Sequence, residues 1–252
     1  MPREDFGQTT KAAVGESDQQ QRLVELFRGS PIPPAELVKN LGLYSTRPVI
    51  SRLLFFADLY RRIVDVQGVI LEFGVRWGQD LAFLTALRDT LEPHNFSRSI
   101  VGFDTFRGFP AVHEKDAGSA PLAAGDYAVT DGYAAHLTDV LRHHQSFAAR
   151  PHIQRFELVE GDVTATFPRW LEQNPHAVVA LAYFDLDLYE PTKKCLELIK
   201  PRLTRGSVLG FDEVNVKEFP GETVAVREAL GFSTLSLRRN PFATWQSFTV
   251  IE

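Results

Sequence analysis

The chain has 252 residues, of which 44% are apolar and 23% charged, a composition that suits one α/β domain with a small addition. Its formal net charge is -5 and no basic run occurs, which excludes a nucleic-acid partner because phosphate recognition needs clustered Lys and Arg. No apolar run approaches the roughly 18 residues of a membrane span and no signal-peptide core begins the chain, so we expect a cytoplasmic protein without a membrane partner.

The first 67 residues are expected to form an arm and a helical cap. Residues 1–20 are polar and aperiodic, which predicts a flexible arm. The spacing of apolar residues predicts helices over residues 21–27, 35–41 and 47–64. Helices that precede the first core strand would form either a cap over residues 21–67 or an oligomer surface, and Phe55 and Phe56 supply apolar area for both. We expect a homo-oligomer, a dimer or a larger assembly.

Strands and helices alternate through the rest of the chain. The predicted strands cover residues 69–73, 99–104, 156–160, 178–187 and 207–212, and the predicted helices cover residues 80–91, 134–147, 167–172, 190–203 and 223–230. Crossover helices between successive strands predict a Rossmann-like, doubly wound, mostly parallel α/β sheet. We therefore expect a single domain over residues 21–252, with its core in residues 68–252.

Three smaller features belong to this core. Segments 233–238 and 244–251 lie close together in the sequence and predict a C-terminal antiparallel hairpin at one sheet edge. Residues 111–133 interrupt the second crossover and resemble a mobile lid, although an inert surface loop is the alternative. The only cysteine, Cys195, lies on an apolar helical face, which predicts a buried thiol and excludes both an internal disulfide and a thiolate metal cluster.

The turn after the first strand reads Glu72-Phe73-Gly74-Val75-Arg76-Trp77-Gly78 and lies where a doubly wound sheet binds a nucleotide. It lacks the Gly-x-Gly-x-x-Gly spacing that lets a backbone approach a pyrophosphate. A cofactor with an adenosine and no pyrophosphate fits better, and S-adenosylmethionine is the common one. An ordinary turn that needs glycine is the alternative.

Acids or glycines also end the next two strands. Asp104 ends the second strand, where its carboxylate would accept hydrogen bonds from both ribose hydroxyls. Gly161 and Asp162 end the third, within reach of an adenine amino group. A solvated strand end is the other interpretation of Asp104.

Carboxylates follow the fourth and fifth strands, at Asp185, Asp187, Asp212 and Glu213. These strands are neighbours in a doubly wound sheet, so their acids should crowd one edge and repel unless a cation or protons intervene. An all-oxygen ligand set favours Mg²⁺, or else Mn²⁺ or Ca²⁺, held by Asp185, Asp212 and Glu213. Asp187 is a ligand, a group that orients a ligand, or the base, and helix capping is the alternative for all four acids.

A cation beside a methyl donor indicates O-methyl transfer, because it lowers the pKa of an acceptor alcohol and fixes its oxygen. Asp185, Asp187 or a histidine would then take the proton. His136 is the candidate histidine, with His113 as a second, although a solvated or core position is the ordinary interpretation of each.

Three motifs carry a resemblance to a known family. They are Leu71-Glu72-Phe73-Gly74-Val75, Gly102-Phe103-Asp104-Thr105-Phe106-Arg107-Gly108-Phe109-Pro110 and Asp185-Leu186-Asp187-Leu188-Tyr189-Glu190-Pro191-Thr192. Over residues 68–213 the chain resembles the macrocin-type sugar O-methyltransferases of antibiotic biosynthesis. That resemblance implies a class I methyltransferase fold that uses S-adenosylmethionine and a divalent metal to methylate a deoxysugar hydroxyl, of a rhamnose type for example, on an antibiotic or other secondary metabolite.

The resemblance also assigns residues. The metal ligands fall on Asp185, Asp212 and Glu213, where the family usually has Asp in place of Glu213, so whether Glu213 binds the metal stays open. Thr105 stands where Ser is common. The cofactor-binding positions are Glu72, Phe73, Gly74, Val75, Gly78, Asp104, Thr105, Arg107, Gly161, Asp162 and Asp185.

Other functions stay open at this point. The acceptor sugar is linked either to an aglycone or to a nucleotide, and a small phenolic or catechol-like acceptor is a further alternative. Tyr189 and Lys193 match the Tyr-x-x-x-Lys pair of NAD(P)-dependent short-chain oxidoreductases, but the pyrophosphate turn and the serine about a dozen residues earlier are missing. A nucleotide-binding protein without catalysis would share the fold but would not need acids at both strand ends.

Overall fold

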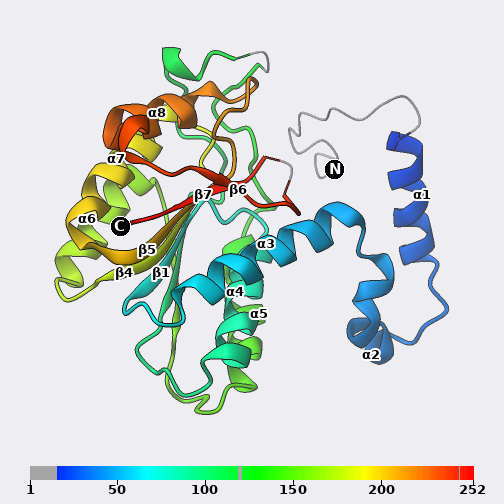
Figure 1. Cartoon of the computed structure of the whole chain (residues 1–252). Helices are drawn as coiled ribbons and strands as arrows, with labels where there is room; N and C mark the ends of the chain where they lie inside the picture. The colour runs from blue at the N-terminus through cyan, green and yellow to red at the C-terminus, as the bar shows by residue number, and fades with distance from the viewer. Residues whose placement is uncertain (1–15, 119–120, 244) are drawn as a thin grey trace.

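The computed structural model describes residues 16–118, 121–243 and 245–252. A seven-stranded sheet with the order β3-β2-β1-β4-β5-β7-β6 forms the middle layer (Figure 1). Strands β1 to β5 run parallel, and β7 pairs antiparallel with both β5 and β6. The strands are β1 Val69–Phe73, β2 Ile100–Asp104, β3 Phe156–Glu160, β4 Val179–Phe184, β5 Leu203–Phe211, β6 Arg238–Arg239 and β7 Ser247–Val250. The predicted doubly wound sheet and its C-terminal hairpin are confirmed.

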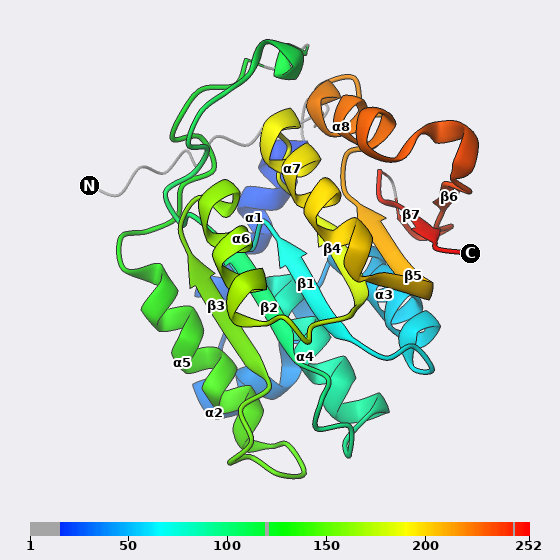
Figure 2. The same ribbon diagram turned by 90° about the vertical axis from the view of Figure 1, so that its left-hand side faces the viewer.

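Helices cover both faces of this sheet, as Figures 1 and 2 show. The long helices are α3 Arg47–Ile63, α4 Gln79–Leu91 and α5 Tyr133–Ser146 on one face, and α6 Val163–Gln173, α7 Tyr189–Ile199 and α8 Pro220–Leu230 on the other. The short 3₁₀ turns are η2 Glu114–Asp116, η3 Lys200–Arg202 and η4 Phe232–Thr234. Successive residues of a strand face opposite layers, so β1 gives Ile70 to one apolar cluster and Leu71 to the other. Among the described residues, no helix combines the length and apolarity that crossing a membrane requires.

Several predicted boundaries differ from the observed ones by a few residues, and two others are wrong for clear local reasons. The fourth strand ends at Phe184 rather than at Asp187, because Asp187 takes a left-handed conformation with φ of 60°. Segment 233–238 is mostly not a strand, because Thr234 turns back onto the carbonyls of Leu230 and Gly231, which leaves β6 only two residues.

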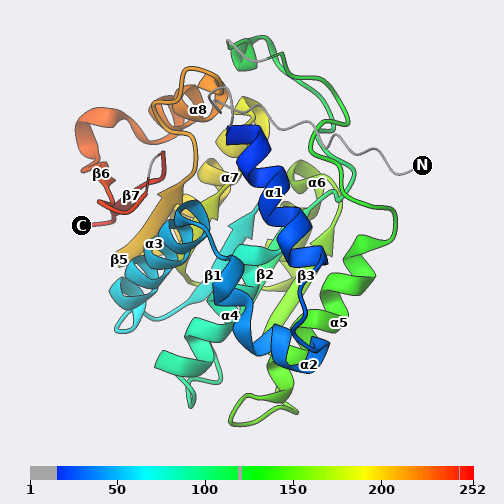
Figure 3. The same cartoon turned by 90° about the vertical axis from the view of Figure 1, so that its right-hand side faces the viewer.

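The N-terminal segment contains helices α1 Glu16–Arg28 and α2 Pro34–Leu37 and the 3₁₀ helix η1 Val38–Tyr44. Of the arm expected over residues 1–20, residues 1–15 lie outside the described part of the chain and residues 16–20 belong to α1. Figures 1 and 3 show α1 standing off on the outer side of the α3–α4–α5 layer. Its apolar side chains and those of η1 are exposed at Val24, Leu26, Phe27, Val38, Leu41 and Leu43. Oligomer formation stays a prediction.

Helix α3 packs on the sheet and belongs to its core. Phe55 and Phe56 are fully buried, and the Phe56 ring lies 4.7 Å from the ring of Tyr183 in β4. Helix α3 contacts both β4 and β5, and its N-terminal half, which contains Arg52, reaches the acids that follow these strands.

The loop between β2 and α5, which contains the expected lid, is tied to the helices that follow β4 and β5. Asp116 is buried, and its Oδ1 accepts a hydrogen bond from the Tyr189 backbone nitrogen at 2.6 Å, at the start of α7. Gly221 at the start of α8 lies so close that a Cβ there would be 2.0 Å from Asp116 Oδ1. The part of the loop around η2 is therefore anchored. Cys195 on α7 is buried, as predicted.

Candidate active site

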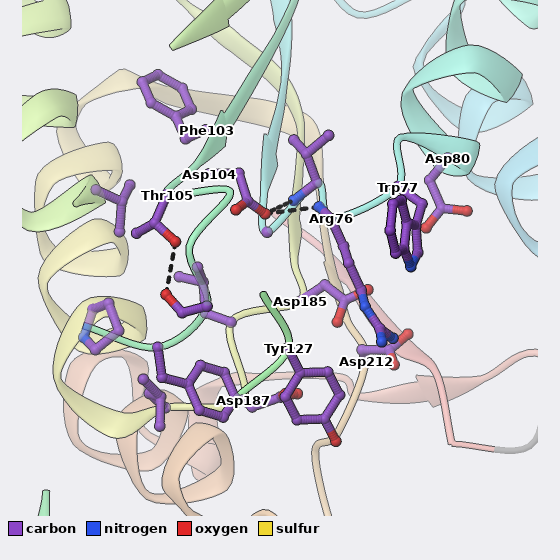
Figure 4. Close-up of a pocket in the computed structure, with 18 of the residues that line it drawn as sticks. Arg76, Trp77, Asp80, Phe103, Asp104, Thr105, Tyr127, Asp185, Asp187 and Asp212 are labelled. Carbon is purple, nitrogen blue, oxygen red and sulfur yellow. Dashed lines mark hydrogen bonds between the residues drawn. The ribbon is translucent and has the colours of Figure 1, made fainter. Parts of the chain in front are cut away.

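The carboxyl ends of β1 to β5 surround a cavity of about 560 Å³. Small-molecule sites typically measure roughly 300 to 1,000 Å³, so this cavity can hold a cofactor together with part of a second molecule. Its lining comes from the turn after β1, the ends of β2 and β3, Tyr127 of the β2–α5 loop, the segment after β4 and the acids after β5. Figure 4 shows these side chains converging from separate elements.

Gly74 and Asp104 fix the turn after β1. Gly74 has φ of 91°, and a Cβ there would lie 1.8 Å from the carbonyl oxygen of Asp185, so only glycine fits. Asp104 Oδ2 accepts hydrogen bonds from the backbone nitrogens of Val75 and Arg76, both at 2.7 Å (Figure 4). Its Oδ1 accepts a third from Phe106 at 2.6 Å. Asp104 thus shapes the turn and lines the cavity, and its Oδ1, which accepts only one of these bonds, retains a lone pair.

Most of the residues predicted for the cofactor meet at this cavity, and three do not. Those that line it are Gly74, Val75, Gly78, Asp104, Thr105, Gly161, Asp162 and Asp185. Phe73 is buried in the apolar core, and Glu72 is buried behind the turn. Arg107 points away from the cavity, with 86% of its side chain exposed and its Nη2 4.0 Å from Glu160.

Arg52 of α3 holds the acids at the ends of β4 and β5 together. Its Nε lies 2.7 Å from Asp80 Oδ2 and 2.9 Å from Asp80 Oδ1. Its Nη2 donates to Asp185 Oδ2 at 2.5 Å, and its Nη1 donates to Asp212 Oδ1 at 2.9 Å. The same Oδ1 of Asp212 accepts hydrogen bonds from the Tyr183 hydroxyl and from Gln246. One guanidinium therefore links α3, α4 and two strand ends.

These contacts shift the pKa values of the carboxyl groups in opposite directions. Burial alone would raise the pKa of Asp212, but Arg52 and the hydrogen bonds from its neighbours lower it below the ordinary value. Burial, together with the charge of Asp212, raises the pKa of Asp185 despite its ion pair with Arg52. Burial likewise raises the pKa of Glu213 and of Glu222, so both favour the protonated form.

A second group of acids lies beside the first. Asp185, Asp187 and Glu213 each place one oxygen within 4.8 Å of the others. Oε2 of Glu213 is buried and has no hydrogen-bond partner in the described part of the chain. Asp212 lies outside this group of three but lines the same cavity. Three clustered carboxyl groups, one of them with an unsatisfied buried oxygen, fit a divalent cation of the Mg²⁺ type.

Asp187 reaches this group through a strained turn rather than through strand alternation. The Leu188 nitrogen donates to the Leu186 carbonyl at 2.6 Å, which encloses Asp187 in a three-residue turn with φ of 60°. Arg76 and Tyr127, which also line the cavity, have positive φ values of 48° and 63°. Such conformations cost about 1 to 3 kcal/mol each and cluster at functional sites.

The remaining candidates lie away from the cavity. His136 is exposed on α5, with its ring 5.6 Å from that of Tyr133. His113 caps η2, and its ring lies 5.0 Å from that of Tyr189. Lys193 Nζ does donate to the Tyr189 hydroxyl at 3.0 Å, but Glu228 binds both side chains and neither lines the cavity.

Sequence reasoning missed Arg52, Asp80 and Glu222. A signal existed for Arg52, because it shares the buried face of α3 with Phe55, Phe56 and Leu59, and a charge on such a face needs a partner. No comparable signal marked Asp80, in the first turn of α4, or Glu222, in the first turn of α8.

Comparisons with known proteins agree with this arrangement. The pattern of a methyltransferase domain matches residues 71–214. A crystal structure of CalS11, a calicheamicin methyltransferase, has 47% sequence identity and a TM-score of 0.93, covering 96% of this chain and 94% of that one. An apo structure of CalS11, described as a TDP-rhamnose 3'-O-methyltransferase in calicheamicin biosynthesis, has 45% identity and a TM-score of 0.84, covering 96% of each chain.

More distant comparisons support the fold alone. The O-methyltransferase NovP is 18% identical with a TM-score of 0.63, over 93% of this chain and 98% of that one. A comparison with curated protein sequences found no significant match. The class I methyltransferase fold expected from the sequence is confirmed by the sheet order and by the CalS11 structures.

The environment of Asp187 predicts a pH-dependent stability. Burial raises the pKa of Asp187 to about 6, although hydrogen bonding to Glu213 opposes the shift. A raised folded-state pKa means that the stability from Asp187 is complete below about pH 4 and is lost as the pH rises through about 6. In the presence of a chelator, the free energy of unfolding of Asp187→Asn relative to that of the parent should therefore rise by roughly 2 to 3 kcal/mol from about pH 4 to about pH 7.

Urea unfolding across this pH range checks the prediction. Asp139→Asn, which changes an exposed acid on α5, is the matched control. Its free energy of unfolding should differ from that of the parent by the same amount at every pH in this range. A difference for Asp187→Asn that does not change with pH would contradict the raised pKa.

Proposed function

The chain belongs to the methyltransferase-domain family, and we propose that it transfers the methyl group of S-adenosylmethionine to a hydroxyl of a nucleotide-linked deoxysugar. The observation that carries this proposal is that one cavity joins the ends of β1 to β3 with the carboxylates after β4 and β5. The description of CalS11 as a TDP-rhamnose methyltransferase supports the nucleotide-linked sugar over a sugar on a finished metabolite. The macrocin-type sugar enzymes are the wider group to which we assign it.

The cofactor is proposed to lie along the turn after β1. Gly74 and Gly78 leave space there, since their φ values of 91° and 76° suit residues without a Cβ. The free lone pair of Asp104 Oδ1 would accept a hydrogen bond from a ribose hydroxyl, and Gly161 and Asp162 would face the adenine. We leave Arg107 out of this set because its side chain points to solvent.

The acidic edge is proposed to hold a divalent cation. Asp185, Asp212 and Glu213 are the proposed ligands, supported by the unsatisfied Glu213 oxygen and by the pKa values of Asp185 and Glu213, which burial raises. A bound cation at this place would lower the pKa of the acceptor hydroxyl and fix its oxygen. Metal binding would then displace the protons that these acids otherwise hold.

Asp187 is proposed as the proton acceptor. With a pKa of about 6 it is largely deprotonated near neutral pH, yet basic enough to take a proton. S-adenosylmethionine bound along the turn after β1 would supply a sulfonium methyl group to the sugar oxygen and leave as the thioether, and Asp187 would take the hydroxyl proton. Asp185 orients the reacting groups, whereas His136 lies on the surface of α5 and has no part in this proposal.

The acceptor class can be tested by mass spectrometry of a substrate panel. With S-adenosylmethionine, we expect TDP-rhamnose to gain one methyl group, and we expect free rhamnose, a rhamnosylated metabolite and a catechol to react much more slowly. Asp187→Asn should lower kcat by roughly 10² to 10⁴, since it removes the proton acceptor while keeping the side-chain shape. Asp139→Asn is again the control. Methylation of the catechol alone would contradict the sugar acceptor.

Chelation tests the cation. EDTA should abolish turnover and Mg²⁺ should restore it. Glu213→Gln should lose most activity because an amide is a poor ligand for Mg²⁺, whereas Glu213→Asp keeps the carboxylate that macrocin-type enzymes usually have at this position. Undiminished turnover in excess chelator would rule out the cation.

A further inference from the structure

Arg52 reaches the acidic edge from outside the part of the chain that matches the methyltransferase domain. It lies on α3, before residues 71–214 that match the methyltransferase domain. Its guanidinium carbon lies 5.8 Å from the ring centres of both Phe56 and Tyr183, so apolar surface holds the side chain on two sides. Only 23% of the Arg52 side chain is exposed. A charge held so firmly at the edge of the cavity is suited to orienting its neighbours.

Asp80 anchors the guanidinium. Both carboxylate oxygens of Asp80 lie within 3 Å of the Arg52 Nε, at 2.9 Å and 2.7 Å, and the Asp80 side chain is 7% exposed. The Nη2 of Arg52 lies 2.5 Å from Asp80 Oδ2 and also donates to Asp185, whereas Nη1 donates to Asp212. A planar guanidinium transmits this orientation rigidly, which a lysine ammonium cannot do.

The bonds from Arg52 use one oxygen of each strand-end acid. Asp185 is bound through Oδ2, and Asp212 is bound through Oδ1. Tyr183 and Gln246 donate to that same Oδ1 of Asp212. Because the two oxygens of a carboxylate diverge, fixing one of them also sets the direction of the other.

We propose that Arg52, anchored by Asp80, is a positioning residue that orients Asp185 and Asp212 for the divalent cation. The inference rests on the cation of the proposed function and adds a specific role for the N-terminal cap. A positioning role predicts that metal binding weakens when Arg52 is replaced. A purely electrostatic role predicts tighter binding when its charge is removed, because deleting a positive charge beside a cation site strengthens cation binding. The sign of the change in metal affinity therefore decides between orientation and charge.

Mn²⁺ binding, followed by the electron paramagnetic resonance signal of the free ion, provides the test. Arg52→Gln and Arg52→Lys should each weaken Mn²⁺ binding by about tenfold or more, the usual effect of removing a group that orients metal ligands. Arg61→Gln, which removes an exposed arginine from the same helix, should bind Mn²⁺ like the parent. Asp80→Asn should weaken binding in the parent but add little to Arg52→Gln, because Asp80 acts through Arg52.

Each other outcome is informative. If Arg52→Gln binds Mn²⁺ as tightly as the parent or more tightly, the positioning role is wrong while the cation stands. If the parent itself binds no Mn²⁺, the cation of the proposed function falls and this inference falls with it. If Arg52→Gln does not fold, Arg52→Lys decides, because it retains the charge, and unchanged affinity in that variant overturns the proposal.

Discussion

The ion pairs of Arg52 with Asp80, Asp185 and Asp212 are the interaction on which this site depends. Carboxylates that crowd a low-dielectric edge repel unless they are protonated, paired or bridged. Arg52 keeps Asp212 ionised and works against the rise in the pKa of Asp185, while Glu213 and Glu222, without such a partner, favour their protons. The apolar packing of α3 on Tyr183 holds this arginine in place, so helix α3 contributes directly to the site.

The loops that form the cavity are held in fixed positions by the ends of the β-strands. Asp104 ties the turn after β1 to the end of β2, and Gly74 allows that turn to lie against Asp185. The cofactor side and the acidic side of the cavity therefore share one wall. Transfer of a methyl group between two bound molecules needs this kind of fixed alignment, because effective concentration depends on orientation. The strained turn at Asp187 adds the proposed proton acceptor to the same wall.

The sheet was predictable because most of the parallel strands are largely apolar and are followed at once by a glycine or an acid. The segments that join successive strands are long enough for a crossover helix, which is how parallel neighbours are connected. The end of β4 was not predictable, since the turn at Asp187 depends on local backbone geometry rather than on hydrophobic pattern. Arg52 lies 133 residues from Asp185 in the sequence, so no motif could join them. Arg107 belongs to a recognisable motif, but its side chain points outward from the turn that Thr105 closes onto Gly108.

The central claim is that the strand-end acids bind a divalent cation beside the cofactor. Crystals grown with Mn²⁺ and S-adenosylhomocysteine, measured at a wavelength where manganese scatters anomalously, test it most directly. We predict one strong anomalous peak in the cavity, bounded by Asp185, Asp212 and Glu213, with Arg52 still bonded to the first two. Bound cofactor with no manganese peak at these acids, or a peak elsewhere in the molecule, would contradict the account.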